Sequence, residues 1–67
     1  MAIGTVKFFD AVKGFGFIAP ESGEKDVFVH ISAVQNSGMD TLSDGQRVSF
    51  EVSMDRGRPA ASDLKAV

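Results

Sequence analysis

The chain has no cysteine, tryptophan or tyrosine, and it has a single histidine. Without thiolates it can form neither a disulfide framework nor a thiolate metal site. No sequence signature links the histidine to a serine and an aspartate, so a nucleophilic catalytic site is not indicated. We therefore expect a protein that is not an enzyme and that has no metal, no cofactor and no small-molecule substrate.

Long apolar segments are lacking as well. No run approaches the roughly 20 residues that span a bilayer, and the stretch MAIGTVKFFD lacks the basic start and apolar centre of a signal peptide. We expect a cytoplasmic protein that does not bind membranes. The 67 residues suffice for a single small domain, residues 1–67. The net charge of −2 does not by itself indicate a nucleic-acid ligand.

Short β-type stretches separated by turn residues predict an all-β fold. The expected strands are 3–10, 15–20, 26–31, 46–54 and 60–67, with one helical turn at 32–35. No segment shows a sustained helical period of apolar residues. A sheet this small has edges to hide, so five short strands predict a closed barrel. An open SH3-like barrel fits the same pattern.

The second and third expected strands each have one aromatic face and one aliphatic or glycine face. Burying the aromatic faces would also bury Lys13, Asp26 and His30, and charged groups are rarely buried without partners. We therefore expect the aliphatic faces to form the core, with the aromatic faces outside. The expected core residues are Ile18, Val27, Val29, Val48, Phe50 and Val52. The expected outer patch contains Phe15, Phe17, Phe28 and His30.

The first strand has adjacent rings, Phe8 and Phe9, which strict alternation places on opposite faces. A bulge or strong twist would let Phe8 join the outer patch while Phe9 caps the barrel. The glycines beside Phe15 fit positions where a neighbouring backbone passes close. Exposed rings about 4.8–6.8 Å apart, interleaved with lysine and histidine, suit unpaired nucleobases. The same patch could instead bind a protein partner.

Several motifs together resemble a known family. KGFGFI at 13–18 and DVFVHIS at 26–32 resemble the two ribonucleoprotein-type motifs of the cold shock domain, and GTVKFFD at 4–10 and LSDGQRVSFEV at 42–52 match the same pattern. The resemblance covers essentially the whole chain. It implies a five-stranded antiparallel Greek-key barrel of the OB type that binds single-stranded RNA and DNA. It also implies an RNA chaperone that regulates transcription and translation in a stress response.

Position by position, the resemblance implies a set of nucleic-acid-binding residues. Bases would stack on Phe8 and the outer patch, Lys7 and Lys13 would contact the backbone, and Arg58 and Pro59 would contribute from the last turn. Two further positions, Ile31 and Met39, stand where the family has aromatic residues. The full expected set is Lys7, Phe8, Lys13, Phe15, Phe17, Phe28, His30, Ile31, Met39, Arg58 and Pro59.

The chain departs from the family pattern at several positions. Phe8 replaces a tryptophan and Ile31 a phenylalanine, which reduces the stacking surface. Asp10 replaces an asparagine and brings a negative charge close to the expected phosphate path. Val12 replaces a polar residue, and Ala60 stands where glutamine often follows the proline.

The resemblance leaves the cellular role open between RNA and DNA. A single-stranded DNA binder that restrains replication, as a dimer, is the alternative to the RNA chaperone. We expect a monomer.

Overall fold

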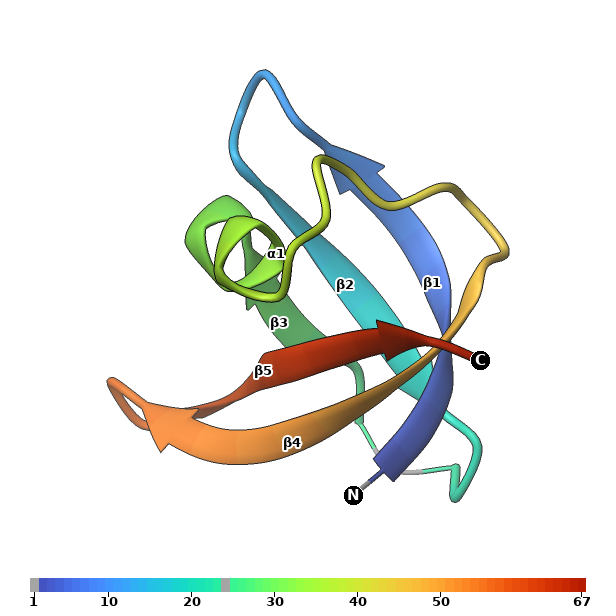
Figure 1. Cartoon of the computed structure of the whole chain (residues 1–67). Coiled ribbons are helices and arrows are strands. Elements are labelled where there is room, and N and C mark those ends of the chain that lie inside the picture. Colours follow the sequence, from blue (N-terminus) through green and yellow to red (C-terminus); the bar gives the residue numbers. More distant parts are fainter. Residues whose placement is uncertain (1, 24) are drawn as a thin grey trace.

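The computed structural model describes residues 2–23 and 25–67. In this part of the chain it has five strands and one short helix: β1 Ala2–Asp10, β2 Phe15–Pro20, β3 Val27–His30, α1 Ile31–Asn36, β4 Arg47–Asp55 and β5 Arg58–Ala66. The strands form a closed barrel in the order β1-β2-β3-β5-β4, and β4 pairs with β1 (Figure 1). The expected five-stranded barrel is confirmed, and its closure excludes the open SH3-like alternative.

The strand pairs are antiparallel except for one. β1 pairs with β2 and β4, β2 with β3, and β4 with β5, all in antiparallel register. β3 and β5 pair in parallel at Phe28 and Ala60, where we expected antiparallel pairing. β5 runs parallel to β3 because of the segment that links β3 to the β4–β5 hairpin. In this segment α1 and the loop after it carry the chain across the barrel before the hairpin begins.

Most element boundaries differ from those expected by one or two residues, and two of these differences have a clear structural cause. The β4–β5 turn contains only Arg56 and Gly57, with φ values of 54° and 81°, so β5 begins at Arg58 and not at Ala60. A two-residue turn with positive φ at both positions matches the twist of antiparallel strands. β3 ends at His30 because that residue caps α1, and Ile31 therefore begins the helix.

The core lies inside the barrel and consists of aliphatic residues with one ring. Five of the six expected core residues are confirmed: Ile18, Val27, Val29, Val48 and Phe50 are each at most 3% exposed. The sequence pattern did not predict the remaining buried residues, Val6, Val34, Leu42, Ala61 and Leu64. Full burial of such a side chain contributes ~1.5–3 kcal/mol, so these residues dominate the stability of the fold.

Val52 was wrongly predicted to belong to the core, since 48% of its surface is exposed. It continues the alternation of Val48 and Phe50 along β4. Among the described residues, however, Ala2 and Phe50 are the last pair between β1 and β4. Beyond Phe50 the β4–β5 hairpin extends past the end of the barrel, as Figure 1 shows. Val52 therefore lies at the open end of the barrel, where it lines a hollow together with Val27 and Pro20.

Candidate nucleic-acid interface

Four phenylalanines and the histidine form one continuous group on the outer face of β1, β2 and β3. We term this group the aromatic platform: Phe8, Phe15, Phe17, Phe28 and His30. Centroids of neighbouring rings lie 5.7–6.4 Å apart. The strand register explains the grouping, because Phe17 lies opposite Phe8 on one side and opposite Phe28 on the other. Each ring is exposed or only partly buried, so the platform can accept a ligand.

A bulge in β1 brings Phe8 onto the platform. The register between β1 and β2 shifts between Val6 and Phe8, which leaves Lys7 as the extra residue. After the shift Phe8 faces Phe17 on the outside, while Phe9 lies opposite Gly16 and packs against the core. The expected roles of the two adjacent rings are thereby confirmed.

Gly16 lies where the inner side of β2 has no room for a side chain. A Cβ placed on this residue would lie 2.8 Å from the Phe9 Cα and would also overlap the carbonyl oxygen of Phe8. The expected close approach of a neighbouring backbone is confirmed at this position. Because β1 occupies the inner side of β2 here, the flanking rings Phe15 and Phe17 face outward.

Three of the expected cationic contacts lie around the platform. The Nζ of Lys7 lies 3.0 Å from Asp26 Oδ2, which forms an ion pair between β1 and the residue that precedes β3. The guanidinium carbon of Arg58 lies 4.0 Å from the centroid of Phe28. Lys13 is exposed in the turn between β1 and β2. The platform therefore has a cationic rim, but Asp26 partly neutralises it.

Asp10 organises the turn that leads into the platform. Its Oδ1 accepts hydrogen bonds from the backbone N–H groups of Val12 and Lys13, at 2.9 and 3.1 Å. Its carbonyl oxygen accepts a further bond from the N–H of Gly14 at 2.7 Å. An asparagine side-chain oxygen could accept the same bonds. The carboxylate therefore keeps the turn geometry and adds a negative charge next to Lys13.

His30 is held in one orientation by the start of α1. Its Nδ1 accepts a hydrogen bond from the backbone N–H of Ser32 at 3.1 Å and lies 2.9 Å from the Ser32 hydroxyl oxygen. This is the usual arrangement of a helix N-cap. The ring is therefore fixed beside Phe28, at a centroid distance of 6.4 Å.

The other three expected contacts lie outside the ring group. Ile31 is half-buried, and its N–H donates to the carbonyl oxygen of Gly14 at 2.9 Å, next to the β1–β2 turn. Met39 packs against the core. Pro59 lines a hollow at one end of the barrel. The base contacts of these three residues stay predictions.

Comparison with known proteins identifies the family. The family model of the "Cold-shock" DNA-binding domain matches residues 2–67. The chain belongs to the cold-shock domain family. A probable cold shock protein of Sinorhizobium fredii is 56% identical over 98% of this chain and 99% of its own length. The cold shock-like protein CspE of Escherichia coli is 53% identical, covering 96% and 93%. Probable cold shock protein A of Mycolicibacterium smegmatis is 51% identical over the full length of both chains.

This membership makes the chain a nucleic-acid-binding cold-shock protein, in agreement with the resemblance that its motifs indicated. Among residues 2–23 and 25–67, no group of three histidine, aspartate or glutamate side chains could hold a metal ion. In the same residues no helix is long and apolar enough to cross a membrane. The absence of a cofactor and of a catalytic activity stays a prediction.

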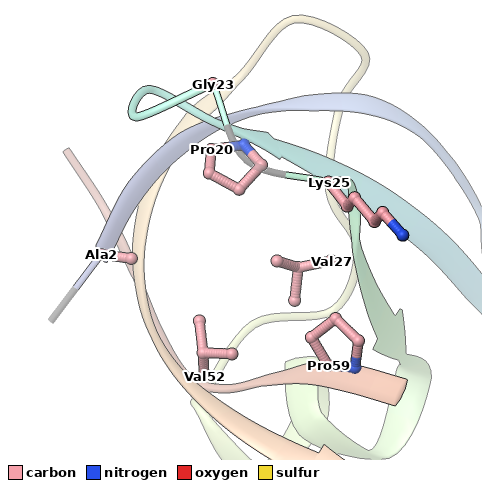
Figure 2. A pocket seen from close by; sticks show the side chains of 7 residues that line it. All are labelled: Ala2, Pro20, Gly23, Lys25, Val27, Val52 and Pro59. Carbon is pink, nitrogen blue, oxygen red and sulfur yellow. The ribbon is translucent and has the colours of Figure 1, made fainter.

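The cold-shock domain has a second exposed apolar surface, the barrel-end hollow, with a volume of ≈ 590 Å³. Its lining residues are Ala2, Pro20, Gly23, Lys25, Val27, Val52 and Pro59. Figure 2 shows valine and proline side chains on opposite sides of this hollow and the Lys25 nitrogen pointing away from it. None of the lining residues in the described part of the chain is aromatic.

Sequence reasoning missed the partners of two expected site residues. Alternation placed Asp26 on the outer face, but its ion pair with Lys7 depends on the register of three strands. The bond between Ser32 and His30 depends on a helix starting one residue earlier than expected. A serine two residues after a histidine at a strand end is the sequence signal that could have indicated it.

Proposed function

We propose that this cold-shock domain binds single-stranded RNA and DNA by stacking unpaired bases on the aromatic platform. The observation that carries the proposal is the continuous set of exposed rings, 5.7–6.4 Å apart, on a sheet face that the core does not use. Each stacked base contributes ~1–3 kcal/mol to binding, as judged by alanine substitution. The stacking is tolerant of sequence, because every base has a π face.

The mechanism is passive capture of single strands. Bases that become unpaired by thermal opening of an RNA helix stack on Phe15, Phe17, Phe28 and His30, and the free energy of stacking shifts the equilibrium towards the open strand. In this way the protein acts as an RNA chaperone in the cytoplasm and affects transcription and translation. One monomer with one platform is sufficient for this activity.

Stacking carries more of the affinity than phosphate contacts do. The chain has a net charge of −2, and Lys7 is already paired with Asp26 at 3.0 Å. A duplex offers the same phosphates but keeps its base faces inside the helix, where the rings cannot reach them. The protein should therefore discriminate strongly between single strands and duplexes.

Titration of the wild-type protein with fluorescent oligothymidine, oligouridine and a duplex of equal length tests the proposal. We expect comparable affinity for the two single strands and weak binding to the duplex. Equal affinity for duplex and single strand would contradict stacking. Binding of the DNA strand but not of the RNA strand would favour the replication role. The mass of the free protein in solution tests whether the protein is a monomer.

A further inference from the structure

Arg58 lies over one ring of the aromatic platform. Its guanidinium carbon is 4.0 Å from the centroid of Phe28, within the range of a cation–π contact. Arg58 begins β5, and β5 pairs with β3 at Phe28 and Ala60, so the closure of the barrel brings it there. Within the described part of the chain, the ion pairs involve Lys7 and Arg47 but not Arg58. Among the described residues, the contact with Phe28 is thus the interaction shown for this guanidinium.

The guanidinium occupies space that a nucleobase needs. The centroids of Phe15, Phe17 and His30 lie 5.8–6.4 Å from that of Phe28, with Phe15 nearly parallel to it, at an interplanar angle of 20°. Arg58 lies closer, over the face of the Phe28 ring. Stacked layers lie about 3.5–4.0 Å apart, so a base between the ring and the guanidinium would require roughly 7–8 Å. The observed 4.0 Å leaves no room for a base. A base can therefore stack on this side of Phe28 only after Arg58 has moved.

We propose that Arg58 is a displaceable cover of Phe28. In the free protein its guanidinium stacks on the ring in the place of a base. A bound base displaces it, and the released cation then pairs with a phosphate of the same strand. This inference rests on the proposed function and adds a step to it.

The chemistry of arginine suits this exchange. A guanidinium is planar and weakly hydrated, so it stacks on aromatic rings at little desolvation cost. An exposed cation–π contact is weaker than a base stacked on an aromatic ring, so the exchange favours the base. The free ring also remains covered and is not left as bare apolar surface.

The cover gives Arg58 two opposite effects on affinity. Covering Phe28 opposes binding of any base, whatever the backbone of the oligonucleotide. Pairing with phosphate favours binding, but only when the backbone is charged. A probe with an uncharged backbone therefore isolates the first effect.

The experiment measures the affinity of two oligothymidines of equal length, one with phosphodiester and one with uncharged methylphosphonate linkages. We expect Arg58→Ala to bind the uncharged probe about two- to fivefold more tightly than the wild type, which matches the size of an exposed cation–π contact. It should bind the phosphodiester probe no more tightly than the wild type. Arg56→Ala, which removes the same charge from the same hairpin, should leave affinity for the uncharged probe unchanged.

Two further measurements make the test decisive. In a Phe28→Leu background, Arg58→Ala should no longer improve binding of the uncharged probe. In NMR spectra of the wild type, the Arg58 δ protons should be shifted upfield by the ring and should lose that shift when the phosphodiester probe saturates the protein.

Unchanged or weaker binding of the uncharged probe by Arg58→Ala would overturn the cover, as would an Arg58 signal that does not move. If the wild type binds the phosphodiester probe, either of these two results rejects only the proposal that Arg58 covers Phe28. The proposed function is then unaffected. If the wild type binds neither probe, the proposed function fails and the cover fails with it.

Discussion

The aromatic platform and the barrel-end hollow both expose apolar side chains, yet they differ in shape and origin. The platform lies on the paired strands β1, β2 and β3 and presents flat rings 5.7–6.4 Å apart. The hollow lies where the β4–β5 hairpin leaves the barrel, and prolines and valines line it. Flat rings with a cationic rim match stacked bases, whereas branched aliphatic walls offer no stacking plane. Exposed apolar area alone therefore does not indicate which ligand a surface takes.

The largest expected effect separates the core from the platform. Phe50→Ala removes a ring with no exposed surface and should destabilise the protein by ~3–5 kcal/mol. Phe17→Ala removes the same atoms from a partly exposed ring and should destabilise the protein clearly less than Phe50→Ala does. Urea unfolding measures both. Equal destabilisation by the two substitutions would mean that the platform rings belong to the core. The platform would then not be an exposed apolar surface that can be compared with the hollow.

The next effect separates the platform from the hollow by binding. Alanine at Phe15, Phe17 or Phe28 should each weaken binding of oligothymidine by ~1–3 kcal/mol, because one stacked base is lost. Val52→Ala, on the wall of the hollow, should change affinity by less than about 0.5 kcal/mol. Fluorescence anisotropy measures both. A loss for Val52→Ala as large as that for Phe17→Ala would show that the hollow binds the strand too.

A smaller effect comes from enlarging the rings. Phe8→Trp and Ile31→Phe should each tighten binding, by about two- to fivefold, because a larger ring adds stacking surface without charge. Val52→Phe adds a ring in the hollow and should leave affinity unchanged. If neither Phe8→Trp nor Ile31→Phe binds more tightly, bases do not reach these two positions.

The smallest effect concerns salt. Each phosphate neutralised by a single-strand binder contributes about −0.7 to the slope of log K against log salt. With Lys7 paired to Asp26, the contacts of Lys13 and Arg58 give a slope of roughly −1.4. Asp26→Asn frees Lys7 and should steepen the slope by about 0.7. An unchanged slope would mean that Lys7 does not contact phosphate, and a wild-type slope beyond about −4 would contradict stacking as the main source of affinity.

Much of the platform could be predicted because it depends on alternation within single strands. Phe15 and Phe17 share a face whatever their neighbours do, and the charged groups on that face indicate that it is exposed. The positions of Met39 and Pro59 could not be derived in this way, since both lie in or beside turns. Their contacts with the core and with the hollow depend on how distant segments pack.

By itself the sequence determined five short strands, the aliphatic side of the second and third, and the rings that face outward, because these follow from the pattern of neighbouring residues. The motifs also determined the family. Only the tertiary structure decided that Val52 is exposed, that Asp26 pairs with Lys7, and that Arg58 covers Phe28. These three outcomes depend on the register between strands and on where the barrel ends, and residues far apart in the chain set both.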